Sequence, residues 1–119
     1  MIVYPGKSRC AAALALLVSA AGALAAPSAE DIAAGKALAG DRNNGNCFAC
    51  HQVEGAELAG NIGPPLVAMK MRFPERQVLY DQVADPRLRN PNTVMPPYGA
   101  HGILSERELN LVIDYLLTL

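Results

Sequence analysis

Two cysteines and a histidine stand close together in the segment Cys47-Phe48-Ala49-Cys50-His51. This spacing lets two thiols add to the two vinyl groups of one haem, while the next residue reaches the iron from the same side. The two thioether bonds keep the cofactor in place even where protein contacts are few. We therefore predict a single haem c that is held by Cys47 and Cys50 and ligated by His51.

Three other uses of paired cysteines fit the sequence less well. A thioredoxin-type redox pair follows a strand in a βαβ unit, and no strand pattern precedes Cys47. A zinc site needs a second pair of ligands, but from residue 26 onward the chain has no other cysteine and one other histidine, His101. A disulfide between Cys47 and Cys50 closes a very short loop, so it would add less stability to a small exported domain than a bridge between distant cysteines.

The iron face opposite His51 needs its own ligand. The candidates are Met69, Met71, Met95, His101 or none. Met95 precedes Pro96 and Pro97, and two prolines stiffen a loop enough to hold a weak thioether against the iron. Thioether ligation also favours reduced iron, which suits an electron acceptor. We predict Met95 as the ligand and keep His101 as the alternative, whereas lone methionines such as Met69 and Met71 more often fill the core.

The segment Gly63-Pro64-Pro65-Leu66 follows the histidine closely enough to support it. The Pro64 carbonyl is placed to accept the hydrogen of the His51 Nδ1 atom, which would fix the tautomer and direction of the ring. Leu66 would then pack on the edge of the haem. The alternative is that the two prolines only shape a turn.

The first 25 residues have the features of a secretory signal peptide. Lys7 and Arg9 precede an apolar run over residues 11–24, and Ala23-Leu24-Ala25 offers a small-x-small cleavage site. The run is shorter than the roughly 20 residues that a membrane span needs. We predict a signal peptide at 1–25, a cytochrome c domain at 26–119, export to the periplasm and no membrane attachment after cleavage.

Composition limits what the remaining domain can be. All eleven acidic residues but only eight of the ten basic ones lie from residue 26 onward, which gives a formal charge of −3 there. A domain with this net negative charge lacks the excess of basic residues that is typical of nucleic-acid binding. A domain of this size with no tryptophan and two phenylalanines is marginal on side-chain burial alone, so we expect a large apolar group at its centre.

Three helices can be predicted around the cysteine segment. Ser28 and Asp31 begin a helix that ends near Gly40 or Asp41, and Pro74 suits the first turn of a second helix that Asp85-Pro86 ends. The last helix has a capping box at Ser105 and Glu108, and its apolar face is formed by Leu109, Val112, Ile113, Leu116 and Leu117. The stretches 47–71 and 87–104 are predicted to be irregular, and no strand is needed.

This order of elements resembles class I cytochrome c. The resemblance implies an all-α fold in which a few helices wrap around one covalently bound haem. It also implies that the first and last helices cross, with a glycine at the crossing that lets an aromatic residue approach. Gly35 and Tyr115 fit those two positions.

A narrower resemblance rests on three segments: Gly45-Asn46-Cys47-Phe48-Ala49-Cys50-His51, Gly60-Asn61-Ile62-Gly63-Pro64-Pro65-Leu66 and Met95-Pro96-Pro97-Tyr98-Gly99. Together they resemble the SoxX family, small mono-haem subunits of the SoxAX cytochrome of bacterial sulfur oxidation. The resemblance implies a larger SoxA-type partner with the catalytic haem, a SoxYZ-type carrier protein reached through the complex, and a soluble cytochrome as electron acceptor. The implied reaction is that of an L-cysteine S-thiosulfotransferase, in which thiosulfate is oxidatively joined to a carrier cysteine.

The residues agree with a non-catalytic role for this chain within such a complex. With His51 and Met95 on the iron, no open position is left for thiosulfate, and no spare cysteine remains as a nucleophile. We therefore expect no catalytic residue here, and electron acceptance as the role. The alternative is a stand-alone periplasmic cytochrome c that serves an oxidase or another redox enzyme.

Overall fold

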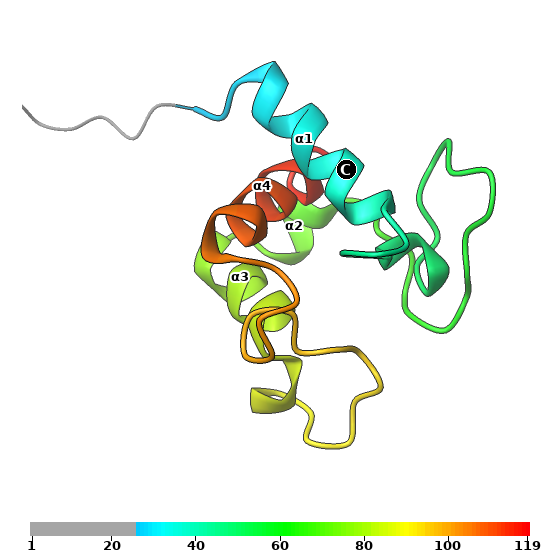
Figure 1. Ribbon diagram of the computed structural model, residues 1–119, viewed down its shortest axis with the longest axis vertical. Coiled ribbons are helices and arrows are strands. Elements are labelled where there is room, and N and C mark those ends of the chain that lie inside the picture. Colours follow the sequence, from blue (N-terminus) through cyan, green and yellow to red (C-terminus); the bar gives the residue numbers. More distant parts are fainter. Residues whose placement is uncertain (1–25) are drawn as a thin grey trace, which may run out of the picture.

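The structure is a computed structural model that describes residues 26–119, so the predicted signal peptide at 1–25 lies outside the described residues. Its elements are, in order, α1 (Ala29–Gly40), η1 (Cys47–Ala49), α2 (Met69–Arg72), α3 (Arg76–Ala84), η2 (Pro86–Leu88) and α4 (Glu106–Leu116). Residues 26–119 contain helices and loops but no strand, which confirms the predicted all-α class (Figure 1).

Both predicted capping boxes are present. The Ser28 hydroxyl accepts from the Asp31 N–H at 3.1 Å, and the Asp31 carboxylate accepts from the Ser28 N–H at 3.1 Å. Ser105 and Glu108 make the same reciprocal pair at the start of α4. These pairs satisfy N–H groups that have no partner inside the helix, so they fix where α1 and α4 begin.

Helix α1 crosses α4 at Gly35, where the two backbones come into direct contact (Figure 1). A Cβ atom at Gly35 would overlap the Leu111 carbonyl oxygen and would stand 2.9 Å from the Tyr115 Cβ. The Tyr115 ring in turn meets Phe48 edge to face, with ring centroids 6.5 Å apart. Gly35 and Tyr115 therefore occupy the crossing, as the resemblance to class I cytochrome c implied.

The middle of the chain is more helical than predicted. The helix predicted from Pro74 begins at Arg76 and ends before Asp85, while the stretch predicted as irregular up to Met71 contains α2 at its end. Helix α2 is a single turn. It is preceded by Ala68, which lies in the left-handed region at φ 50°, and it ends where the Phe73 N–H donates to the Met69 carbonyl. So short a turn leaves no periodic pattern to detect in the sequence.

The core lies between α4, α3 and the loops that follow η1. It contains Met69, Leu79, Val83, Leu109, Val112, Ile113, Tyr115 and Leu116, all less than a tenth exposed. The expectation that both methionines of the 69–71 region fill the core is right for Met69 and wrong for Met71, which is 84% exposed. The two methionines are two residues apart in α2, so their side chains point to opposite sides of the helix. Within residues 26–119, every helix is too short or too polar to cross a membrane.

Enlarging Gly35 tests the crossing. Gly35→Ala places a methyl group against α4 backbone that has no freedom to move away, so we expect a loss of about 2 kcal/mol or more in the free energy of unfolding. Denaturant unfolding of the holoprotein measures it. Ala37→Ser, on the exposed side of α1, is the control and should stay within about 0.5 kcal/mol of the parent. An unchanged midpoint for Gly35→Ala would contradict the close approach.

Candidate haem site

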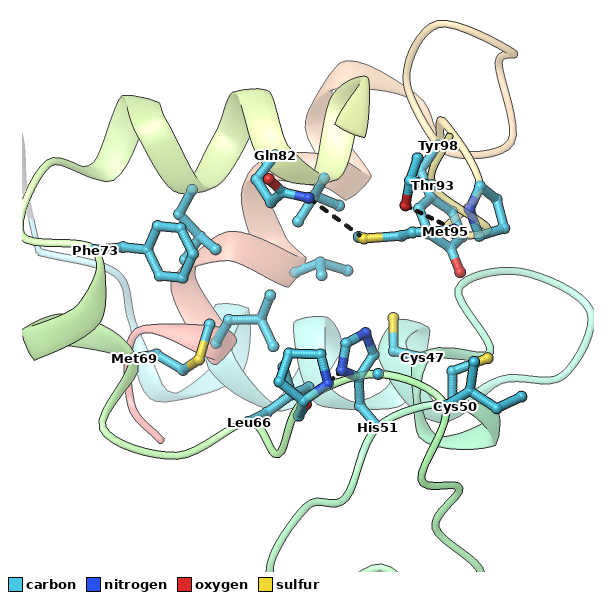
Figure 2. Close-up of a pocket in the computed structure, with 18 of the residues that line it drawn as sticks. Cys47, Cys50, His51, Leu66, Met69, Phe73, Gln82, Thr93, Met95 and Tyr98 are labelled. Carbon is cyan, nitrogen blue, oxygen red and sulfur yellow. Dashed lines mark hydrogen bonds between the residues drawn. The ribbon is translucent and has the colours of Figure 1, made fainter. Parts of the chain in front are cut away.

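A cavity of about 430 Å³ lies beside the core, within the range of small-molecule and cofactor sites. Its walls come from the segment 47–51, the loop at 62–66, α2, α3, the loop at 93–98 and α4 (Figure 2). Every cofactor-site residue predicted from the sequence lines this one cavity: Cys47, Cys50, His51, Pro64, Leu66 and Met95.

The cysteine segment forms one wall. Asn46 takes the left-handed conformation at φ 48°, which turns the chain from α1 into the short η1. The Cys50 and His51 N–H groups both donate to the Cys47 carbonyl, at 3.2 and 3.0 Å. This tight turn carries both thiols and the imidazole on the same wall of the cavity (Figure 2).

His51 is fixed by two contacts from the loop that passes beneath it. Its Nδ1 atom lies 2.7 Å from the Pro64 carbonyl oxygen, so the ring donates there and carries its proton on Nδ1. The Nε2 atom is thereby left free to act as a metal ligand. Gly63 lies flat against the ring, since a Cβ there would stand 2.6 Å from Nδ1 and 2.8 Å from Nε2. The hydrogen bond predicted between His51 and Pro64 is present.

Met95 faces this wall from the opposite side of the cavity. Figure 2 shows the His51 ring pointing into the opening and the Met95 sulfur lying across from it, at the end of a side chain that extends toward Gln82. The Met95 N–H donates to the Thr93 hydroxyl at 3.1 Å, and the Gln82 amide nitrogen lies 3.8 Å from the Met95 sulfur. The methionine is therefore held at its backbone and contacted at its thioether by a residue of α3.

The alternative ligands lie elsewhere. Met69 lines the cavity, but its sulfur is 3.6 Å from the Arg72 guanidinium, away from His51 (Figure 2). Met71 is exposed and does not line the cavity. His101 also lies outside it, with its Nε2 atom 3.2 Å from Arg87. Of the four candidates, Met95 is the one that faces His51.

The cavity is apolar with a small set of polar groups. Burial raises the pKa of the Cys47 thiol to about 11 and that of the Tyr98 hydroxyl to about 12, so both are neutral at pH 7. Positive charge comes from Arg72 and Arg89. The Arg72 guanidinium donates to the Pro65 carbonyl at 2.8 Å and lies over the Phe73 ring.

This donor set fits haem c. Two thiols stand on the same wall as an oriented imidazole, a thioether faces them, and the apolar walls match a porphyrin. The two arginines match the negative charge of its carboxylates. Sequence reasoning missed Arg72, Arg89 and Gln82. For Gln82 a signal existed, because it follows the buried Leu79 by one helical turn and so stands on the inward side of α3.

Comparison with known proteins agrees with this geometry. A family model described as cytochrome c oxidase, cbb3-type, subunit III matches residues 30–116. An uncharacterized lipoprotein of Aquifex aeolicus (strain VF5) is 33% identical over 78 residues, which cover 65% of this chain and 38% of that protein. The chain thus spans well under half the length of this relative. A chain in the crystal structure of SoxXA from P. pantotrophus superposes with a TM-score of 0.65 at 27% identity, covering 72% of this chain and 79% of that one.

The contacts that fix the His51 ring can be tested by a substitution at Gly63. Gly63→Ala pushes the ring off the Pro64 carbonyl, so we expect a several-fold lower yield of protein with covalent haem and an altered spectrum in what remains. Absorbance of the pyridine haemochrome per protein measures the yield. Asn61→Ala, on the exposed part of the same loop, is the control and should match the parent. A normal yield and spectrum for Gly63→Ala would contradict the fixed ring.

Proposed function

Given that this chain belongs to the cytochrome c family described as cytochrome c oxidase, cbb3-type, subunit III, we propose that it is the mono-haem, electron-accepting subunit of a SoxXA-type complex that oxidises thiosulfate. Membership of the family makes the chain an electron-transfer cytochrome with haem c. The observation that supports the finer proposal is the likeness to a chain of SoxXA, together with the placement of His51 and Met95 on opposite sides of one cavity.

In this proposal each residue of the cavity has a defined task. Cys47 and Cys50 would bind the haem covalently, and Pro64 orients His51 so that its Nε2 atom would be available to hold the iron. Met95 would be the second residue to hold the iron, and Leu66, which lines the same cavity, would pack against the edge of the ring. Arg72 and Arg89 balance the carboxylates. The haem, when bound, supplies a one-electron redox centre.

If His51 and Met95 both held the iron of a bound haem, no position would be left there for substrate, so the proposal assigns the sulfur chemistry to a partner. Joining thiosulfate to a carrier thiolate forms one S–S bond and releases two electrons. A chain with one haem accepts one of them at a time and passes it to an acceptor. The proposed partners are a larger SoxA-type subunit, a SoxYZ-type carrier and a soluble cytochrome, and the proposed location is the periplasm.

The assignment of the axial ligand is tested by Met95→Ala. Loss of the thioether should remove the weak sulfur-to-iron band at the red end of the oxidised spectrum. It should also lower the potential within the roughly 0.8 V range that axial ligands span. The opened face should let carbon monoxide bind to the reduced protein. Absorbance spectra and a redox titration measure these changes.

His101→Ala is the matched control, because His101 is exposed outside the cavity and should leave spectrum and potential unchanged. The opposite pattern, a parent spectrum in Met95→Ala and a shifted one in His101→Ala, would move the ligand to His101.

The role in thiosulfate oxidation is tested by reduction of the haem in reconstituted mixtures. We expect the oxidised chain to stay oxidised with thiosulfate alone, and to be reduced when a di-haem partner and the carrier protein are both present. The absorbance of the reduced α-band follows the reaction. Reduction by thiosulfate without the partner, or none in the full mixture, would contradict the proposal.

A second candidate is an electron carrier to a terminal oxidase, which is favoured by the description of the matching family. It predicts that the reduced chain supports oxygen uptake by a terminal oxidase, with no dependence on thiosulfate or on a di-haem partner.

A further inference from the structure

The amide of Gln82 is turned toward the methionine that lies across the cavity from His51. Gln82 belongs to α3, one helical turn after the buried Leu79, and its half-buried side chain lines the cavity. Its amide nitrogen lies 3.8 Å from the Met95 sulfur, a contact distance for nitrogen and the larger sulfur atom. Figure 2 shows the two side chains extending toward each other from α3 and from the loop at 93–98.

The backbone sets where Gln82 stands beside the loop that carries Met95. The end of α3 accepts three hydrogen bonds from this loop. They run from the N–H groups of Tyr98, Gly99 and Ala100 to the carbonyls of Val83, Ala84 and again Ala84, at 3.3, 3.0 and 3.1 Å. A Cβ atom added at Gly99 would stand 3.1 Å from the Ala84 Cβ, so the helix and the loop are in close contact. Because Gln82 directly precedes the two acceptors, these bonds fix its position relative to Met95.

The second glutamine of α3 shows how an amide is placed when it has no contact with the cavity. Gln77 is exposed, and its amide nitrogen donates to the Asp81 carboxylate at 2.8 Å. A carboxylate is a strong acceptor, whereas the thioether contacted by Gln82 is a weak one. A polar side chain thus stands at an inward position where an apolar one would stabilise the fold more, which points to a role at the sulfur.

An N–H group at this position acts on the sulfur in two ways. Methionine has a flexible side chain with three rotatable bonds, and a donor at the sulfur limits its rotation. The donor also places the positive end of the amide dipole at the sulfur and draws electron density from it. Both effects disfavour the oxidised, more positive state of an iron that this sulfur holds, so they raise its reduction potential.

We propose that Gln82 is a positioning residue for the methionine ligand, whose amide holds the Met95 thioether in place and raises the reduction potential of the loaded protein. This inference rests on the ligation by Met95 that is part of the proposed function, and it deepens that proposal by naming the residue that tunes the site. It depends neither on thiosulfate nor on the identity of the partner.

The test compares Gln82→Leu with the parent, both as holoproteins. Leucine removes the donor and keeps an apolar side chain of similar size in the cavity. The potential should fall, which shifts the equilibrium with a fixed one-electron redox partner several-fold, up to the tenfold that corresponds to about 59 mV. Added imidazole should displace the freed thioether in the oxidised protein several-fold faster, and the weak sulfur-to-iron band should shift. A redox titration and stopped-flow absorbance measure these changes.

Gln77→Leu is the matched control, because it makes the same substitution on the same helix outside the cavity, and it should match the parent in both measurements. Gln82→Met keeps an unbranched side chain of the same length without a donor, and it should behave like Gln82→Leu. It decides the test if the branched leucine lowers the yield of holoprotein.

An unchanged potential, an unchanged rate of displacement, or equal changes in Gln77→Leu would overturn the role of Gln82. Loss of haem in both Gln82 variants would make this residue a requirement for folding, which would overturn it as well. In each of these cases the proposed function stands if Met95→Ala still alters the spectrum. A parent spectrum in Met95→Ala would instead remove the ligand itself, and this inference with it.

Discussion

The crossing of α1 and α4 at Gly35 is the constraint on which the site depends. Helix α1 leads directly into the turn that presents Cys47, and α4 supplies Val112 and Leu116 to the wall of the cavity. Bringing the two helices into backbone contact at Gly35 therefore sets how far the cysteine segment stands from the opposite side of the cavity. A side chain larger than hydrogen at this position would separate the two walls, and the distance from His51 to Met95 would change with it.

Much of this arrangement could be predicted because it is encoded locally. The capping boxes at Ser28 and Ser105 depend on residues three apart, and the cysteine segment sets its own geometry through bonds to the Cys47 carbonyl. The Pro64 carbonyl could be predicted as the partner of His51 because two prolines and a glycine leave few conformations to the loop. In the first two cases the determining residues are neighbours in sequence, and in the third the partner of His51 lies 13 residues along the chain in a segment whose own residues restrict its conformation.

The features that escaped prediction depend on how the short helices are oriented and packed against the loops of the cavity. Gln82 reaches Met95 only because α3 packs beside the loop at 93–98, and Arg72 faces the cavity only because the single turn of α2 rotates it there. The same turn sends Met69 inward and Met71 outward, which composition could not distinguish. Single-turn helices carry too little periodicity to orient their side chains from sequence alone.

The apolar character of the buried residues has a consequence for the rate of electron movement. No polar or charged side chain of residues 26–119 is fully buried, and the thiol and phenol that face the cavity are neutral at pH 7. With a haem bound, few buried dipoles of the protein would turn when the charge at the centre changed by one. That would keep the protein's share of the reorganisation energy small, so a modest driving force would suffice for fast transfer. A wall built of Leu66, Leu79 and Val83 thus acts on kinetics as well as on stability.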